Sequence, residues 1–235
     1  MENYESKIKK ITLGIRFERA YRLLDNWGVI VDNLLNVEES FFDESFFPQI
    51  TSKNDFEKML INSNTDDYLK ITPHDLIFSY NFRNSDGFQE KFKWFQKVVK
   101  KEIIENIIEK FSLENFKRVG LVFEHYFDTN SEIEKIVNTL FNTDIIEPKD
   151  IRFSARTPAN IQIMLDKSKT DYINRIFTIA NDDKDNNIIS FDYQYYFEPK
   201  IKDFSLFNMD KFFKASITSL NQSIYSLVSE EDDNA

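Results

Sequence analysis

Four side chains of this sequence could take part in acid–base or metal chemistry, and two of them are neighbours. They are Glu18, Glu124, His125 and Asp192. A histidine beside a carboxylate suits proton transfer or metal binding. Side chains alternate between the two faces of a strand, however, so a strand over Phe116–Asp128 sends Glu124 and His125 to opposite faces. We therefore expect His125 to be a core or interface histidine, and the four residues remain candidates for a carboxylate-based catalytic site.

Two Glu-Pro-Lys triplets, Glu147–Lys149 and Glu198–Lys200, each follow an aspartate, as in nucleases that hold Mg²⁺ with carboxylates. Proline removes a hydrogen-bond donor from a strand, so we expect both triplets in turns that flank strands. The segment Asp183–Asn187 begins like a calcium-binding loop, but Ile188 and Gln194 stand where that loop needs glycine and glutamate. The chain also has no cysteine, and we expect no metal site and no cofactor.

Anion binding has a separate set of candidates, because Arg152 and Arg156 share the polar face of a predicted strand. Together with Arg175 they form a candidate anion pocket, since guanidinium groups bind carboxylates and phosphates. Ordinary surface arginines are the alternative. The predicted strand Asn187–Glu198 alternates aromatic and polar residues, a pattern that can stack nucleic-acid bases. It carries no basic stripe, so core packing beneath the C-terminal helix is the favoured role.

Composition disfavours several other functions. Four scattered glycines cannot form a Walker A loop or a G-x-G-x-x-G loop, and no G-x-S-x-G motif is present. The net charge is −10, which disfavours general nucleic-acid binding and allows binding to a basic partner. No segment has the apolar length of a signal peptide or a membrane span, so we expect a cytoplasmic protein without membrane contact.

The elements that must position these residues follow from hydrophobic periodicity. Alternation with period two predicts strands, and apolar residues spaced three and four apart predict helices. The predicted strands cover Lys9–Arg19, Phe46–Ile50, Tyr68–Ile71, Asp75–Phe82, Phe116–Asp128, Asp150–Arg156, Asn160–Lys167, Thr170–Ala180 and Asn187–Glu198. The predicted helices cover Ala20–Leu35, Asp55–Ile61 (one or two turns), Gly87–Phe111, Asn130–Asn142 and Met209–Val228.

The order of these elements predicts an α+β fold with antiparallel or mixed sheets and helices packed on one face, because the strands come in hairpins. Two similar α+β subdomains, residues 1–128 and 129–228, are one arrangement, and a single continuous sheet is the alternative. We find no internal sequence repeat beyond the two Glu-Pro-Lys triplets. Residues 229–235 form an acidic tail that we expect to be disordered.

The opening strand with Ile15–Phe17, the long middle helix and the stretch Phe116–Leu121 resemble a family of uncharacterised, sporadically distributed prokaryotic proteins of similar length. The resemblance covers the order of elements over most of the chain, and only Phe116–Leu121 is motif-like. After this stretch the family tends to have Arg, Tyr and an Ile-Asn pair, where this chain has Val122, Phe123 and Glu124. The resemblance implies no activity and no site residue.

The acidic surface and the lack of a recognisable catalytic set favour a non-catalytic bacterial protein, phage- or defence-associated, that acts by binding another protein. An enzyme with an unrecognised carboxylate-based site, metal-dependent or not, is an alternative from a different class. A small-ligand sensor, with a pocket between the helices and the aromatic sheet, is another. A homodimer is compatible with the sequence.

Overall fold

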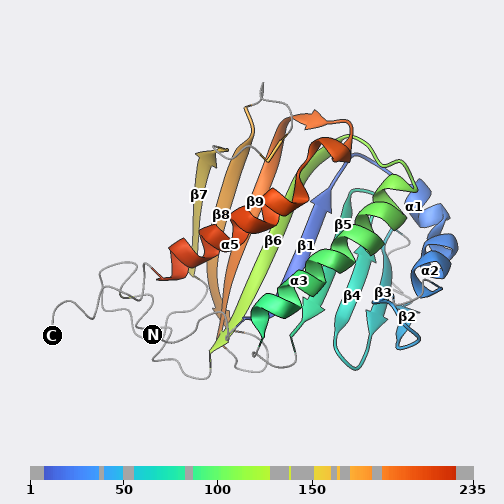
Figure 1. The fold of residues 1–235 in the computed structure, drawn as a ribbon, viewed down its shortest axis with the longest axis horizontal. Coiled ribbons are helices and arrows are strands. Elements are labelled where there is room, and N and C mark those ends of the chain that lie inside the picture. The colour runs from blue at the N-terminus through green and yellow to red at the C-terminus, as the bar shows by residue number, and fades with distance from the viewer. Residues whose placement is uncertain are drawn as a thin grey trace.

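A nine-stranded antiparallel sheet organises the chain (Figure 1). The computed structural model describes residues 8–36, 40–49, 56–82, 87–127, 138, 151–159, 163–164, 170–181 and 187–225. The strands are β1 (Ile8–Arg16), β2 (Phe46–Gln49), β3 (Lys58–Asn62), β4 (Asp67–Ile71), β5 (Asp75–Asn81), β6 (Phe116–Phe127), β7 (Ile151–Pro158), β8 (Tyr172–Asn181) and β9 (Asn187–Ile201). They lie in the order β2-β3-β4-β5-β1-β6-β9-β8-β7, which confirms the antiparallel sheet and the α+β class.

Helices cover one face of this sheet. The described helices are α1 (Arg22–Asp25), α2 (Trp27–Leu35), α3 (Phe88–Val98), a π-helix (Val99–Glu109) that continues α3, a 3₁₀ turn (Phe204–Leu206) and α5 (Met209–Tyr225). Figure 1 shows α3 and α5 lying across the same face, over the central strands. None of the described helices is long and apolar enough to cross a membrane.

Strands β1 and β6 lie in the middle of the sheet and pair with each other. Leu13 pairs with Leu121, Gly14 with Gly120 and Arg16 with Arg118. The leucines are fully buried on the helix side. Because side chains alternate along a strand, the glycines and arginines lie on the opposite face. The alternation predicted for both strands therefore separates the core residues on the helix side from the residues on the opposite face.

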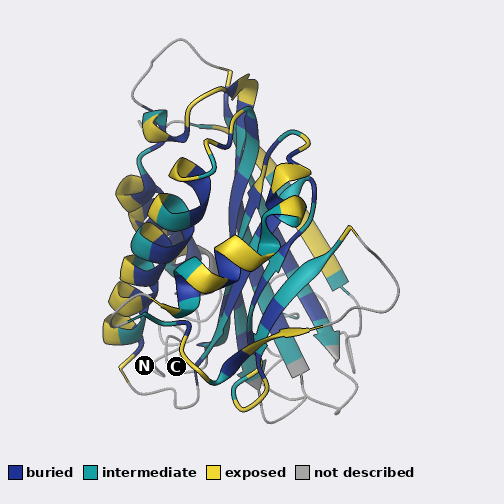
Figure 2. Cartoon of the chain, turned by 90° about the vertical axis from the view of Figure 1, so that its right-hand side faces the viewer, coloured by how far each residue is buried: buried dark blue, intermediate teal, exposed yellow. Residues whose placement is uncertain are grey.

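Aromatic rings fill the space between the helices and the sheet. Phe78 stacks on Phe95 with ring centroids 5.4 Å apart, and Tyr193 of β9 packs against Phe212 of α5 at 5.6 Å. Figure 2 shows buried residues on the sheet and on the helix surfaces that face it, with exposed residues on the outer side of the helices. The core role expected for the aromatic face of β9 is confirmed, because Tyr193 and its neighbours are buried.

Two expectations for local structure are wrong. Lys58–Asn62 forms strand β3 instead of part of a helical turn, because β2 and β4 pair with it on both sides. Glu198–Lys200 lies inside β9 instead of in a flanking turn. The ladder to β6 is irregular there, since Phe116 pairs with Ile201 while Arg118 pairs with Tyr196. Such an irregularity accommodates a proline that has no N–H to donate.

The remaining predicted elements agree with the structure or lie outside its described residues. The helix predicted over Ala20–Leu35 is two helices, interrupted at Asn26. The helix Asn130–Asn142, apart from Asn138, the triplet Glu147–Lys149 and the acidic tail lie outside the described residues. So does most of the strand predicted over Asn160–Lys167, of which Met164 makes an isolated bridge with Phe207.

Candidate binding site on the open sheet face

The sheet face opposite α3 and α5, which we call the open face, carries most of the polar side chains of the central strands. Figures 1 and 2 show no described helix crossing β1, β6 or β9 on this side. Its central residues are Lys10, Thr12, Gly14, Arg16, Arg118, Gly120, Val122, Glu124, Asp192, Gln194 and Tyr196. Most of them are half-buried. The open face is therefore a surface of side chains held closely together rather than freely solvated.

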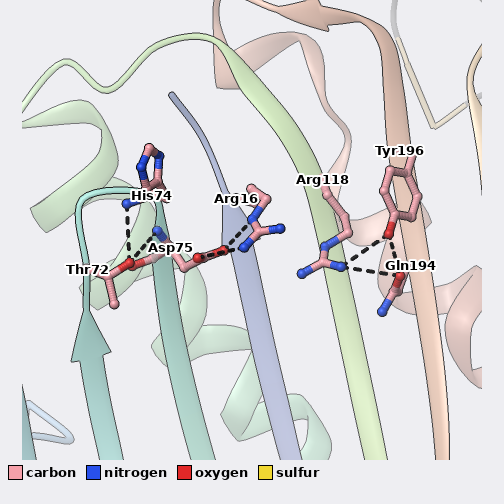
Figure 3. A network of polar contacts seen from close by, with 7 residues as sticks. All are labelled: Arg16, Thr72, His74, Asp75, Arg118, Gln194 and Tyr196. Carbon is pink, nitrogen blue, oxygen red and sulfur yellow. Dashed lines mark hydrogen bonds and ion pairs between the residues drawn. The ribbon is translucent and has the colours of Figure 1, made fainter. Parts of the chain in front are cut away.

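Hydrogen bonds connect residues of the open face across neighbouring strands (Figure 3). Arg16 donates to both carboxylate oxygens of Asp75, at 2.8 Å from Nε and 3.1 Å from Nη2. Arg118 donates to the hydroxyl of Tyr196 at 3.2 Å and to Oε1 of Gln194 at 3.4 Å. Within the described part of the chain, Arg16 thus has an acidic partner, whereas the hydrogen-bond partners of Arg118 are uncharged.

Beside this network, the turn before β5 is fixed by Thr72. The backbone N–H groups of His74 and Asp75 both donate to Oγ1 of Thr72, at 3.2 and 2.9 Å. Figure 3 shows how this turn places Asp75 next to Arg16. His74 joins the network through its backbone N–H, and Figure 3 draws no contact from its imidazole to the other labelled residues.

Aromatic rings extend the site toward β7. Tyr196 and Tyr172 stack with centroids 4.6 Å apart and an interplanar angle of 8°. The guanidinium of Arg156 lies 3.4 Å from the centroid of the Tyr172 ring, and that of Arg118 lies 5.6 Å from the Tyr196 ring. Cation–π contacts of this kind contribute about 0.5–2 kcal/mol each, depending on exposure. Two arginines and two tyrosines therefore form a row across four strands.

Asp192 lies on the open face of β9, opposite Val122 of β6. Its Oδ2 accepts a hydrogen bond from Nε2 of Gln194. Burial raises the pKa of Asp192 to about 6, although the hydrogen bond from Gln194 and the charges of Arg118 and Arg152 act in the opposite direction. The cost of removing this carboxylate from water thus exceeds the stabilisation that its neighbours supply.

The structure does not bring the four candidate catalytic residues together. Glu18 is ion-paired with Lys200, and the hydrogen bond from that lysine lowers the pKa of Glu18. Glu124 lies on the open face, 3.2 Å from the ammonium of Lys10. His125 is buried on the helix side of the sheet, on the opposite face from its neighbour Glu124.

The imidazole of His125 is held as a neutral core group. Its side chain is 1% exposed, and Nδ1 lies 3.3 Å from the carbonyl oxygen of Ile189. Burial lowers the pKa of His125 to about 4, against the opposing effect of backbone hydrogen bonds. Desolvation of the charged form accounts for this direction. The position corresponds to the core histidine expected from the strand pattern.

The three candidate anion-binding arginines are divided between the two faces. Arg152 and Arg156 lie on the open face of β7. Arg175 lies on the helix side of β8, where it donates to the hydroxyls of Ser219 and Thr157, both at 2.7 Å. The structure thus places only Arg152 and Arg156 on a common surface.

Other kinds of site find little support in the described residues. Within the described ranges, no three His, Asp or Glu side chains gather closely enough to hold a metal ion. A cavity of about 540 Å³ lies at one end of the helix layer, lined by residues 108–109, 112–114 and 202–205. These residues come from the end of the π-helix and the chain after β9, not from between the helices and the aromatic sheet.

Sequence reasoning missed Arg118, Tyr172 and Gln194 as members of the site. The signal that unites them is strand register, since Arg118 pairs with Tyr196, and Tyr196 pairs with Tyr172 on its other side. Comparisons with known proteins add no further constraint: no family model matches the chain, and no curated protein matches it significantly.

Proposed function

We propose that this chain is a non-catalytic prokaryotic or phage-associated protein that acts by binding another protein through the open face of its sheet. The observation that carries the proposal is the network of Figure 3, a row of polar and aromatic side chains on the sheet face that α3 and α5 leave uncovered. A broad, half-buried surface of this kind suits a protein partner, because protein interfaces are enriched in arginine and tyrosine.

Gly14 supports a close approach by the partner. A Cβ atom built on Gly14 would have no other atom within 4 Å, so internal packing does not require a glycine. Glycine within a strand costs about 0.5–1 kcal/mol relative to alanine. A glycine inside a strand often marks a place where another backbone or a ligand approaches the sheet closely. Gly14 lies beside Gly120 at the centre of the open face, and of the two only Gly14 is partly exposed.

The two halves of the chain are proposed to be similar α+β units that share one sheet. From the centre outward, the strands run β1, β5, β4, β3 on one side and β6, β9, β8, β7 on the other. Each series is followed in the chain by a long helix, α3 or α5, on the same face. The proposed boundary lies at residues 110–115, before β6, instead of at residue 128.

Sequence identity at equivalent positions supports this duplication. Gly14–Glu18 reads G-I-R-F-E and Gly120–Glu124 reads G-L-V-F-E. Because the paired glycines are also equivalent, a pseudo-twofold axis passes between them, perpendicular to the sheet. Across this axis, Phe92 of α3 meets Phe213 of α5 with centroids 5.8 Å apart.

A pair of buried aspartates supports the same equivalence. Asp67 opens β4 and its carboxylate accepts a hydrogen bond from the backbone N–H of Asn81, at 2.6 Å. Asp171 immediately precedes β8 and accepts from the backbone N–H of Glu198, at 2.9 Å. A tyrosine follows each aspartate in the chain. In each half, an aspartate carboxylate thus accepts a hydrogen bond from the backbone of the strand that pairs with the central strand, β5 or β9.

The binding proposal is tested by blocking the open face at a position where the fold tolerates a side chain. Gly14→Gln places a long side chain over β1, and Gly28→Gln is the matched control, since a Cβ on Gly28 of α2 also has nothing within 4 Å. Tagged wild type and both variants are used to capture proteins from cells of the native host, with quantitative mass spectrometry. We expect a partner that binds the wild type and Gly28→Gln and is lost with Gly14→Gln. Identical binding to all three proteins would contradict the proposal.

A carboxylate-based enzyme is the second candidate function, because a pKa near neutrality suits a general acid or base and Asp192 has a raised pKa of about 6. If a metal-dependent site uses Asp192, Mg²⁺ or Mn²⁺ raises the melting temperature of the wild type and leaves that of Asp192→Asn unchanged. Equal melting curves with and without the metals count against a metal-dependent site.

A further inference from the structure

One difference between the two halves concerns the partner of an aspartate on the open face. In the N-terminal half, Arg16 lies opposite Asp75 and holds its carboxylate with two hydrogen bonds, at 2.8 and 3.1 Å. In the C-terminal half, Val122 of Gly120–Glu124 is the equivalent of Arg16, and Val122 lies opposite Asp192. The C-terminal half therefore keeps the aspartate and lacks the arginine.

Among the described residues, the carboxylate of Asp192 is hydrogen-bonded through one of its two oxygens. Its Oδ2 accepts from Gln194, whereas Oδ1 has no hydrogen-bond partner among the described residues. Oδ1 lies beside Gly120, where a Cβ would make ordinary van der Waals contact with it at 3.6 Å. In the N-terminal half, two guanidinium nitrogens occupy both oxygens of the aspartate.

We propose that Asp192 binds the guanidinium of an arginine side chain supplied by the partner protein, in the place that Arg16 fills in the N-terminal half. The inference rests on the proposed binding function and names the chemistry of its partner. Guanidinium groups pair with carboxylates through two parallel hydrogen bonds, which a lysine ammonium cannot form. The net charge of −10 also favours the approach of a basic partner.

The charged groups around Asp192 do not fully compensate its carboxylate, so a further cation can bind there. Arg118 and Arg152 act on Asp192 from β6 and β7, and yet burial keeps its pKa raised, so the carboxylate is incompletely compensated. Arg118 makes its hydrogen bonds to Tyr196 and Gln194. Glu124, the nearest acid along β6, is paired with Lys10. Neutral neighbours, Ile176 on β8 and Val122 on β6, complete the surroundings.

Supplying the arginine within the chain tests the site without a partner. In Val122→Arg, we expect the new guanidinium to pair with Asp192 and the pKa of Asp192 to fall from about 6 toward its ordinary value of 3.8. The measurement is a carbon-13 NMR titration of the side-chain carboxylates, with Asp192→Asn assigning the signal. Val122→Gln is the matched control, because it adds length without charge, and should leave the pKa near 6. An unchanged pKa in Val122→Arg would overturn the inference.

A peptide pair tests whether an external arginine reaches the site. The wild type is titrated with acetyl-Gly-Arg-Gly-amide and with the same peptide carrying citrulline, which has the shape of arginine and no charge. We expect the arginine peptide alone to move the Asp192 signal, and Val122→Arg to abolish the response. The inference would be overturned if both peptides moved the Asp192 signal equally, or if neither peptide moved it. Failure of the capture experiment with Gly14→Gln contradicts the proposed function instead, so the two failures are distinguishable.

Discussion

Replacing Asp192 with asparagine should make the folded protein more stable than the wild type at pH 8 and no more stable at pH 4. Burial raises the pKa of Asp192 from 3.8 to about 6. Across that window folded Asp192 holds a proton that the unfolded chain has released, so the contribution of Asp192 to stability falls as the pH rises from 3.8 to about 6 and stays lower above it. Each pKa unit corresponds to about 1.4 kcal/mol, which sets a ceiling of about 3 kcal/mol on the gain in Asp192→Asn.

The assay is urea denaturation of both proteins at pH 4, 6 and 8, with the free energy of unfolding extrapolated to water. Asparagine preserves the shape of the side chain, so packing against Gln194 is retained. Asp210→Asn is the control, because Asp210 is an exposed residue of α5 paired with Lys100. We expect a gain of about 1–3 kcal/mol at pH 8 for Asp192→Asn, within the linkage ceiling. A gain of the same size at pH 4 and pH 8 would refute the reasoning, because an effect that ignores pH does not come from the carboxylate's titration.

Three further predictions concern other parts of the fold. Asp67→Ala and Asp171→Ala should each lower stability by about 1–3 kcal/mol in chemical denaturation, since each leaves a buried backbone N–H without its acceptor; a loss in only one variant would argue against equivalent roles. Because burial lowers the pKa of His125 from 6.5 to about 4, the unfolded chain takes up a proton that folded His125 does not, so the stability of the wild type relative to His125→Gln should fall as the pH falls from 6.5 to 4. Gly14→Ala and Gly120→Ala should both leave stability equal or higher, because a Cβ on Gly14 meets no atom within 4 Å and one on Gly120 makes ordinary van der Waals contact with Gln194 at 3.4 Å; a lower melting temperature in either variant would contradict this.

The sequence predicts the strands of this fold well wherever one face is apolar. The alternation of β1 and β6 correctly separates Leu13 and Leu121 from Arg16 and Arg118. It also places His125 in the core and Glu124 on the other face. The sequence predicts one or two helical turns over Asp55–Ile61, and only the pairing of Lys58–Asn62 with β2 and β4 makes this segment a strand. Local pattern cannot report such pairing.

The candidate site was less predictable, because register assembles it. Arg118 and Gln194 are far apart in the chain and meet only when β6 pairs with β9. The proposed duplication is hard to recognise in the sequence for a related reason. Only Gly14–Glu18 and Gly120–Glu124 retain an obvious match, and five residues are too few to be distinguished from chance. The structure supports the short match, because Gly14 and Gly120 pair with each other across β1 and β6.

The pairing of β1 with β6 also determines how a partner can use the open face. Because both are central strands, the two halves present one continuous surface, and in the proposed duplication the guanidinium positions beside Asp75 and Asp192 are equivalent. A partner carrying one arginine could in principle use either position. Arg16 occupies the first from within the chain, and Val122 leaves the second open. In the proposed arrangement, the difference between Arg16 and Val122 at equivalent positions therefore fixes the orientation of the bound partner. Exchanging the two residues, Arg16→Val with Val122→Arg, should move the partner's arginine to the N-terminal half.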